Sequence, residues 1–319
     1  MQLSLGNWVL EEALKQLTIW NTQGFNTKVS INIDSMQLND PEFSQRVLSH
    51  LGDFTNVDPA QLELEILETN ALEEIQNVSQ LIEDLQSNDI QFALDDFGTG
   101  YSSMTFLKNL PATTIKIDQS FVRQMLFDSE QMIIVDSVIN LSKRFGRTVL
   151  AEGVETELHG LFLSALGCEQ AQGYGIAKPM PANEVLRWTQ EWQCPTLWTQ
   201  VRRLSPSEVD SLLLVVEHIG QCRALRIEHN HHTLRTTPFE KMDFINWFCS
   251  LASATDPRLH QINQQIPSEI ESLRLALNHG QSCDDLAHQS NQIVANMLKV
   301  IFRDVDFELP SNCKMFEFD

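Results

Sequence analysis

Short apolar segments alternate with helical patterns over roughly the first 190 residues of the chain. Segments that are apolar or rich in β-branched residues predict strands at 28–33, 62–67, 90–96, 113–118, 148–153 and 170–175. Amphipathic patterns predict helices at 3–21, 40–54, 71–87, 102–110, 131–145, 157–166 and 181–192. Strands alternating with helices at this spacing predict right-handed βα units and a parallel sheet. The number of units favours an α/β fold of the (β/α)8 TIM-barrel type over an open doubly wound sheet.

The pattern changes after Cys194-Pro195. Helices are predicted at 205–233, 239–254, 258–278 and 282–303, with no strand between them. Four helices joined by short loops are typical of an antiparallel bundle. We therefore predict two domains, an α/β barrel at 1–194 and an all-α helical bundle with a regulatory or sensory role at 195–319.

Composition indicates a globular protein without a membrane segment. Of the 319 residues, 42% are hydrophobic and 20% charged. No apolar run approaches the roughly 18 residues that a membrane-spanning helix needs. The six cysteines show no pairing pattern, so reduced thiols and a cytoplasmic location are expected.

The net charge of −21 argues against binding to DNA or RNA polymers through a basic surface. The excess lies mainly in residues 1–194, where 27 acids and 11 bases give −16. A cleft rich in carboxylates repels a phosphate substrate unless cations neutralise it, so metal dependence fits this charge. An ordinary acidic, solvated surface is the alternative.

Polar residues recur where the predicted strands end, which is where barrel enzymes place their active sites. These residues are Asn32, Glu65, Glu68, Asp95, Asp96, Lys116, Asp118, Glu152, Glu155 and Gln172. A charge in a buried strand costs several kcal/mol unless it is paired or binds a metal. Asn, Asp and Glu oxygens suit Mg²⁺ or Mn²⁺, and such a site can support attack of water on a phosphate ester. A purely structural ion-pair ladder around Lys116 is the alternative.

The segment Asp95-Asp96-Phe-Gly-Thr-Gly-Tyr-Ser-Ser103 allows two interpretations of its own. Two carboxylates before a glycine-rich stretch can form a common turn with a helix cap. That interpretation is the commoner one for the segment alone, but after a buried strand the two carboxylates can also form the metal-binding end of that strand, followed by a flexible loop.

Taken in order, six fragments resemble the EAL-domain cyclic-di-GMP phosphodiesterases. They are Ser30-Ile-Asn-Ile33, Leu62-Glu-Leu-Glu-Ile-Leu-Glu68, Asp95 to Ser103, Ile115-Lys-Ile-Asp118, Ala151-Glu-Gly-Val-Glu-Thr156 and Gln172-Gly-Tyr174. The resemblance covers about residues 3–192. It implies a (β/α)8 barrel, a homodimer, and cleavage of cyclic di-GMP to the linear dinucleotide pGpG with two Mg²⁺ or Mn²⁺ ions.

The resemblance also implies roles for individual residues. Metal ligation is implied for Asn32, Glu65, Asp95, Asp96 and Glu152. Roles at the attacking water or the substrate are implied for Lys116 and Gln172, with Asp96 and Glu152 counted among the catalytic residues. A loop that couples metal binding to dimerisation, with its anchoring residues, is implied for Glu68, Gly98, Thr99, Gly100 and Glu155.

One feature of the family is missing from this sequence. The Glu-Ala-Leu motif, expected on a first barrel strand, does not precede the helix at 3–21. Glu12-Ala13-Leu14 spells the same letters but lies inside that helical pattern. Either the chain is a fragment of a longer enzyme, which we favour, or its barrel is open and damaged. We expect weak or absent hydrolysis by this chain, and the alternative is a non-catalytic cyclic-di-GMP receptor or protein-interaction module.

Histidines are concentrated in the C-terminal part of the chain. His218 and Cys222 lie four residues apart on one predicted helix, a spacing that could contribute to a Zn²⁺ site. Without a second closely spaced ligand pair, ordinary histidines in a helical bundle are the favoured interpretation.

Overall fold

The computed structural model describes residues 2–73, 75–99, 107–108, 110–230, 291–292, 294–299 and 301–302. The chain divides into two compact units. Unit 1 comprises Met1–Ser120, Ser137–Val154 and Cys168–Gln193, and unit 2 comprises Phe121–Asp136, Glu155–Gly167 and Cys194–Asp319. One crossing between the units falls at the predicted boundary near residue 194, but unit 2 also takes two earlier segments. The assignment of residues 195–319 to a regulatory bundle stays a prediction, because 231–290 lie outside the described residues.

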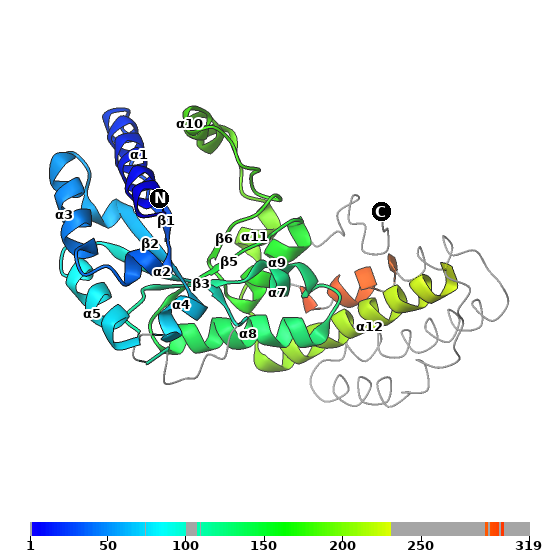
Figure 1. Ribbon diagram of the computed structural model, residues 1–319. Helices are drawn as coiled ribbons and strands as arrows, with labels where there is room; N and C mark the ends of the chain where they lie inside the picture. Colours follow the sequence, from blue (N-terminus) through cyan, green and yellow to red (C-terminus); the bar gives the residue numbers. More distant parts are fainter. Residues whose placement is uncertain are drawn as a thin grey trace. The chain divides into compact units, whose positions relative to one another are not determined.

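The centre of unit 1 is a parallel sheet of six strands (Figure 1). The strands are β1 (Val29–Ile33), β2 (Leu62–Leu67), β3 (Gln91–Phe97), β4 (Thr114–Ile117), β5 (Thr148–Ala151) and β6 (Gln170–Ala171). They follow one another in chain order, and every neighbouring pair is parallel. Among the described residues β1 and β6 are each paired on one side only. The predicted α/β fold and all six predicted strands are confirmed.

Alternation along the strands separates an apolar face from a polar one. On β2, Leu62, Leu64 and Ile66 are at most 1% exposed and face the surrounding helices. Glu63 and Glu65 point to the opposite face, which is the interior of the curved sheet, and they are buried too. The fold therefore places acids in a protected interior and leaves hydrophobic burial to the outer face.

The helices predicted at 3–21, 40–54, 131–145 and 181–192 are observed with shifted ends and the one at 157–166 with its predicted ends, whereas most of the helix predicted at 102–110 lies outside the described residues. The described helices are α1 (Gln2–Thr22), α2 (Ser35–Leu38), α3 (Phe43–Asp53), α4 (Glu68–Glu73), α5 (Ile75–Gln86), α7 (Gln119–Gln124), α8 (Ser129–Arg144), α9 (Glu157–Leu166), α10 (Ala182–Glu191), α11 (Thr196–Gln200) and α12 (Pro206–Asn230). The single helix predicted at 71–87 is divided between α4 and α5. The short α2, α7 and α11 carry too few residues for a periodic pattern to reveal them.

Strand β6 is shorter than the predicted 170–175 because its end approaches the loop after β5. A Cβ added at Gly173 would lie 2.3 Å from the backbone of Val154. Hydrogen bonds still hold this segment, from Gln172 N to Ala151 O at 2.8 Å and from Val154 N to Gln172 O at 3.0 Å. Gln172 is therefore fixed in position although it lies beyond the strand.

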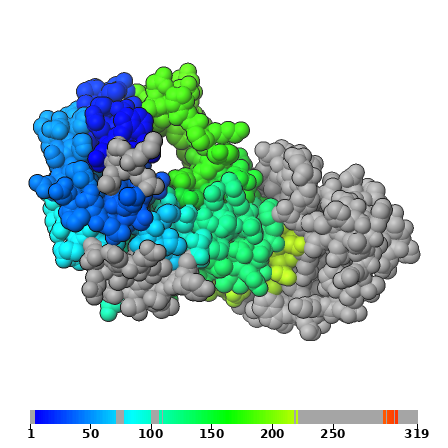
Figure 2. Space-filling view, in the orientation of Figure 1, coloured from blue at the N-terminus to red at the C-terminus, as the bar shows by residue number. Residues whose placement is uncertain are grey.

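Glu12-Ala13-Leu14 lies within α1, as predicted. Leu14 is fully buried, whereas Glu12 is on the surface and pairs with Lys15 at 2.9 Å. Figure 2 shows α1 in dark blue on the surface of unit 1, and its Leu5 and Trp8 side chains are more than half exposed. Glu12, Ala13 and Leu14 are therefore helical residues and do not form a barrel strand.

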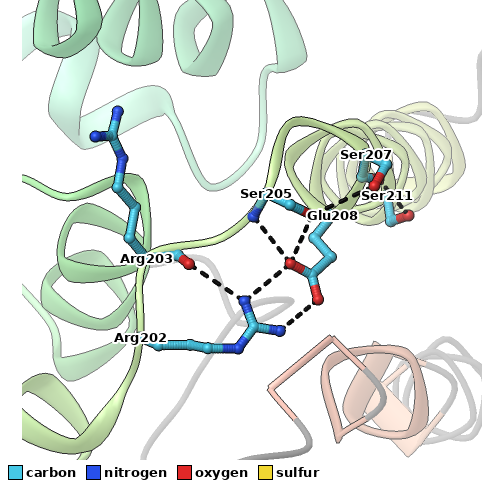
Figure 3. Close-up of polar contacts among 6 residues, drawn as sticks. All are labelled: Arg202, Arg203, Ser205, Ser207, Glu208 and Ser211. Carbon is cyan, nitrogen blue, oxygen red and sulfur yellow. Dashed lines mark hydrogen bonds and ion pairs between the residues drawn. The ribbon is translucent and has the colours of Figure 1, made fainter.

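In unit 2, the start of α12 is held by a polar cluster (Figure 3). The Arg202 guanidinium donates to both carboxylate oxygens of Glu208, at 2.5 and 2.9 Å. Ser205 donates its backbone N–H and its hydroxyl to Glu208 Oε2. The hydrogen bond from Arg202, followed by those from Ser205, lowers the pKa of Glu208 to about 2 despite partial burial. Together these contacts satisfy donors at the N-terminus of the helix.

Within the described residues, no helix combines the length and the apolar character needed to cross a lipid bilayer.

Arg147, just before β5, stabilises the chain that leads into β4. Its guanidinium donates to the carbonyl oxygens of Leu107, Leu110 and Ala112, each at 2.5 Å. Replacing it with methionine (Arg147→Met) leaves these part-buried acceptors unpaired, so we expect a loss of about 2 kcal/mol in the free energy of unfolding. Urea denaturation followed by circular dichroism measures this loss. Arg147→Lys should recover only part of it, since one ammonium cannot span three carbonyls, and full stability of Arg147→Met would contradict the prediction.

Candidate active site

One lysine on β4 gathers the acids of three other strands. Lys116 Nζ lies 2.8 Å from Glu65 Oε2 on β2, 2.9 Å from Asp95 Oδ1 on β3 and 2.7 Å from Glu152 Oε1, which follows β5. The lysine side chain is 4% exposed and the three carboxylates are at most 13% exposed. Because the strands are parallel, their carboxyl ends meet at one edge, and the side chains converge there.

Burial and mutual repulsion shift the pKa values of these groups. Burial raises the pKa of Glu65 and of Glu152, and the nearby Lys116 only partly reverses the effect. Burial would lower the pKa of Lys116, but its hydrogen bonds with Glu152 and Glu65 outweigh this and the pKa is raised. The lysine is therefore a fixed cation, and the carboxylates around it carry more negative charge than it can balance.

An irregularity in β3 explains how the adjacent Asp95 and Asp96 serve the same site. In a regular strand neighbouring side chains point to opposite faces. The pairing of β3 with β4 shifts register between Leu94 and Phe97, and Asp96 adopts a left-handed backbone with φ of 54°. A bulge of this kind redirects one side chain. As a result Asp95, Asp96 and Glu152 offer carboxylate oxygens that lie within 4.8 Å of one another.

Asp118 is a further acid beside Asp96. Burial, followed by the charges of Asp95 and Asp118, raises the pKa of Asp96 to about 6. The Asp118 carboxylate also accepts the backbone N–H of Ser120 at 3.0 Å, which fixes it at the start of α7. The sequence analysis lists Asp118 among the polar residues at the strand ends but gives it no role, and its place two residues after Lys116 puts both on the same face of the chain.

The segment after β3 is attached to α4. Gly98 N donates to Glu68 Oε2 at 2.8 Å, and Glu68 is only 1% exposed. Thr99 turns back and donates its hydroxyl to the carbonyl of Asp96 at 2.9 Å. The contact between Glu68 and Gly98 thus links two neighbouring strand ends. Gly100 lies outside the described residues.

The remaining predicted residues differ in their contacts. Gln172 joins the acids directly, because its Nε2 donates to Glu152 Oε1 at 2.9 Å. Asn32 is the register partner of Glu65 across β1 and β2, but its side chain is exposed. In unit 2, Glu155 pairs with Arg123 at 2.8 Å. His218 and Cys222 lie four residues apart on α12, as predicted, but their side chains are outside the described part, so zinc binding stays a prediction.

The donor set fits a divalent cation. Carboxylate oxygens are the ligands that Mg²⁺ and Mn²⁺ prefer. Asp95 Oδ1 is buried and, although Lys116 Nζ lies 2.9 Å away, it accepts no hydrogen bond of normal geometry from the described residues. A buried oxygen with unused acceptor capacity, next to Asp96 and Glu152, is what a cation site requires.

Sequence reasoning missed a second layer of polar contacts below these acids. Glu63 accepts hydrogen bonds from the Ser30 hydroxyl at 2.9 Å and from the Thr114 hydroxyl at 3.1 Å. The alternation of Glu63 with Leu62 and Leu64 indicates that Glu63 lies on the polar face. Alternation does not reveal a contact between strands that are not neighbours.

The sequence model of the EAL domain matches residues 1–179, more than half of this chain, which therefore belongs to the EAL domain family. Two curated relatives come from Pseudomonas aeruginosa and Escherichia coli. The bifunctional diguanylate cyclase/cyclic di-GMP phosphodiesterase MucR is 34% identical over 185 residues, 58% of this chain and 27% of MucR. The E. coli cyclic di-GMP phosphodiesterase PdeR is 33% identical over 184 residues, 58% of this chain and 28% of PdeR. The chain thus matches less than a third of each relative's length.

Solved structures of the same family share the fold. The MucR phosphodiesterase in its c-di-GMP complex superposes with a TM-score of 0.56 at 34% identity, covering 57% of this chain and 74% of that one. The EAL domain of Mycobacterium smegmatis DcpA gives a TM-score of 0.57 at 35% identity, covering 60% of this chain and 86% of that one. The parallel sheet described above is thus of the EAL barrel type.

The raised pKa of Asp96 predicts a pH-dependent cost in the metal-free protein. Above pH 6 the folded chain must hold a charge that its surroundings disfavour, whereas near pH 4 the folded state keeps this group protonated. Asp96→Asn removes the charge, so we expect it to stabilise the protein in EDTA by about 1 kcal/mol at pH 8, after allowance for solvent screening, and much less at pH 4. Urea unfolding at both pH values measures the gain. The exposed Asp53→Asn is the control, and an equal gain at both pH values would refute the prediction.

Proposed function

We propose that unit 1 catalyses metal-dependent hydrolysis of cyclic di-GMP to the linear dinucleotide pGpG. The observation that carries this proposal is the Lys116 ammonium surrounded by three carboxylates, each at most 13% exposed, at the ends of parallel strands. Membership of the EAL family supports it, because two relatives are named cyclic di-GMP phosphodiesterases and one solved neighbour is a complex with this dinucleotide.

In this proposal Glu65, Asp95, Asp96 and Glu152, assisted by Asn32, hold two Mg²⁺ or Mn²⁺ ions. Such ions neutralise a phosphodiester and make water a better nucleophile at neutral pH. Lys116 supplies a fixed positive charge and hydrogen-bond donors that orient the attacking water. Gln172, already bonded to Glu152, contributes a second polar group at the same position. Water attacks phosphorus, one P–O ester bond breaks, and the released ribose oxygen takes a proton.

Regulation through the segment after β3 is part of the same proposal. Gly98 is hydrogen-bonded to Glu68, and Thr99 to the Asp96 carbonyl. A movement of this segment would therefore shift Asp96. We assign a regulatory role to this segment, including Gly100, and to Glu155, in a cytoplasmic homodimer. Substrate binding would then depend on formation of the homodimer.

A non-catalytic receptor for cyclic di-GMP is the second candidate. The observation that favours it is the state of β1, which has one paired neighbour among the described residues and leaves Asn32 exposed. A ligand position that is poorly enclosed would weaken metal binding while leaving other dinucleotide contacts in place. Retention of the acid cluster favours the enzyme, since a receptor does not need hard metal ligands.

The two candidates differ in product formation by the full chain. With cyclic di-GMP and Mn²⁺ we expect slow formation of pGpG, none in EDTA, and at least a hundredfold loss in Lys116→Met, because orientation of the water and a fixed charge are both removed. Anion-exchange chromatography of the nucleotides measures the rates, and isothermal calorimetry measures binding. Glu184→Gln on α10, an exposed residue away from the acids, is the control. Binding without any product would establish the receptor instead, and neither binding nor product would reject both.

A further inference from the structure

We propose that Glu63 is a positioning residue that ties β1 to β4 and thereby sets the alignment of Asn32, Glu65 and Lys116. The inference rests on the proposed function, because it concerns the same acids. Glu63 is not among the predicted metal ligands, and it forms no hydrogen bond with those acids.

The first observation is a bridge between strands that are not neighbours. Strand β2 pairs with β1 and β3, and β4 lies beyond β3. The two oxygens of the Glu63 carboxylate are divided between these sides, Oε1 accepting from Ser30 Oγ on β1 and Oε2 accepting from Thr114 Oγ1 on β4. Glu63 and Thr114 are 9% and 7% exposed, so the contact with β4 is largely shielded from water.

The second observation concerns the interior side of β3, which the Glu63 side chain must cross to reach β4. Ala93 is the β3 partner of Thr114 on one side and of Glu65 on the other. Its side chain ends at Cβ and it is 1% exposed. A larger residue there would fill the interior between β2 and β4. The small side chain therefore lets the longer Glu63 reach Thr114.

The third observation is the relation of this layer to the acids. Ser30, Glu63 and Thr114 each precede by two residues a member of the proposed site, namely Asn32, Glu65 and Lys116. Side chains two apart on a strand share a face, about 7 Å from one another. The Glu63 bridge thus forms the layer of interior side chains next to the proposed site. We expect a change in the separation of β1 and β4 to alter the spacing of Asn32, Glu65 and Lys116.

Strand β1 is linked to the sheet by its ladder with β2 and, in addition, by this tether. It has one paired neighbour among the described residues, so its position relative to β4 is set by β2 and by the Ser30–Glu63 contact. If that contact is lost, the backbone pairing of β1 with β2 remains, but the interior side chains of β1, including Asn32, lose their side-chain link to β2. The effect should appear in metal affinity before it appears in the folding of the sheet.

The test measures Mn²⁺ binding to the full chain without nucleotide, by the electron paramagnetic resonance signal of free Mn²⁺. Glu63→Leu removes the bridge at similar volume and is expected to weaken Mn²⁺ binding at least tenfold. Ser30→Ala combined with Thr114→Val removes the two donors and should weaken it similarly, and adding this pair to Glu63→Leu should cause no further loss. Glu63→Gln retains an acceptor and a donor for the two hydroxyls, so its affinity should stay within threefold of the unaltered chain.

A stability control separates positioning from general damage. Leu62→Val lies on the same strand but faces the helices, so it should lower the unfolding midpoint without changing Mn²⁺ affinity. Equal affinities of Glu63→Leu and Leu62→Val would overturn the inference, as would failure of the unaltered chain to bind Mn²⁺. If Mn²⁺ binding responds as expected but cyclic di-GMP is not hydrolysed, the positioning role stands and the proposed function falls.

Discussion

The charge balance around Lys116 is the constraint on which the interior of unit 1 depends. Three carboxylates, those of Glu65, Asp95 and Glu152, contact one ammonium, and Asp96 lies beside Asp95 and Glu152. Buried like charges are costly, and the raised pKa values of Glu65, Asp96 and Glu152 express that cost. An ion-pair ladder built only for stability would not need this excess of acids. Divalent cations would restore the balance, so the same arrangement that destabilises the metal-free protein makes it suited to metal-dependent chemistry.

The sheet makes this concentration of charge tolerable. Its outer face is closely packed with aliphatic and aromatic side chains such as Leu64, Phe92 and Ile115, none of which is exposed. This packing supplies the stability that the inner face lacks. Because the strands are parallel and in register, a shift of one strand would move its apolar side chains inward and its acids outward. The hydrophobic pattern therefore protects the site as well as the fold.

The sequence alone predicted the strands, the parallel sheet and the residues at the strand ends, because alternation and helical periodicity are local signals. It could not show that adjacent Asp95 and Asp96 serve one site, which depends on a register shift and a left-handed residue in β3. Nor could it show the contact of Glu63 with Thr114, since pairing patterns define neighbouring strands and not contacts across them. The end of β6 was predicted too far along the chain, since the strand ends at Ala171 and the following residues, with Gly173 close to Val154, are held by hydrogen bonds outside the regular strand.

The exposure of Asn32 on β1 is the structural feature that separates the two candidate functions, enzyme and receptor. Glu65 on β2, Asp95 on β3 and Glu152 just after β5 belong to strands with neighbours on both sides, and all three contact Lys116. Asn32 instead lies on a strand with one paired neighbour among the described residues, and its side chain is exposed. If Asn32 serves as a metal ligand, its position depends on the pairing of β1 with β2 and on the Ser30–Glu63 hydrogen bond. In the proposed site, the enclosure of Asn32 at β1 would therefore limit metal binding, while the excess of carboxylates around Lys116 would supply the negative charge that attracts a cation.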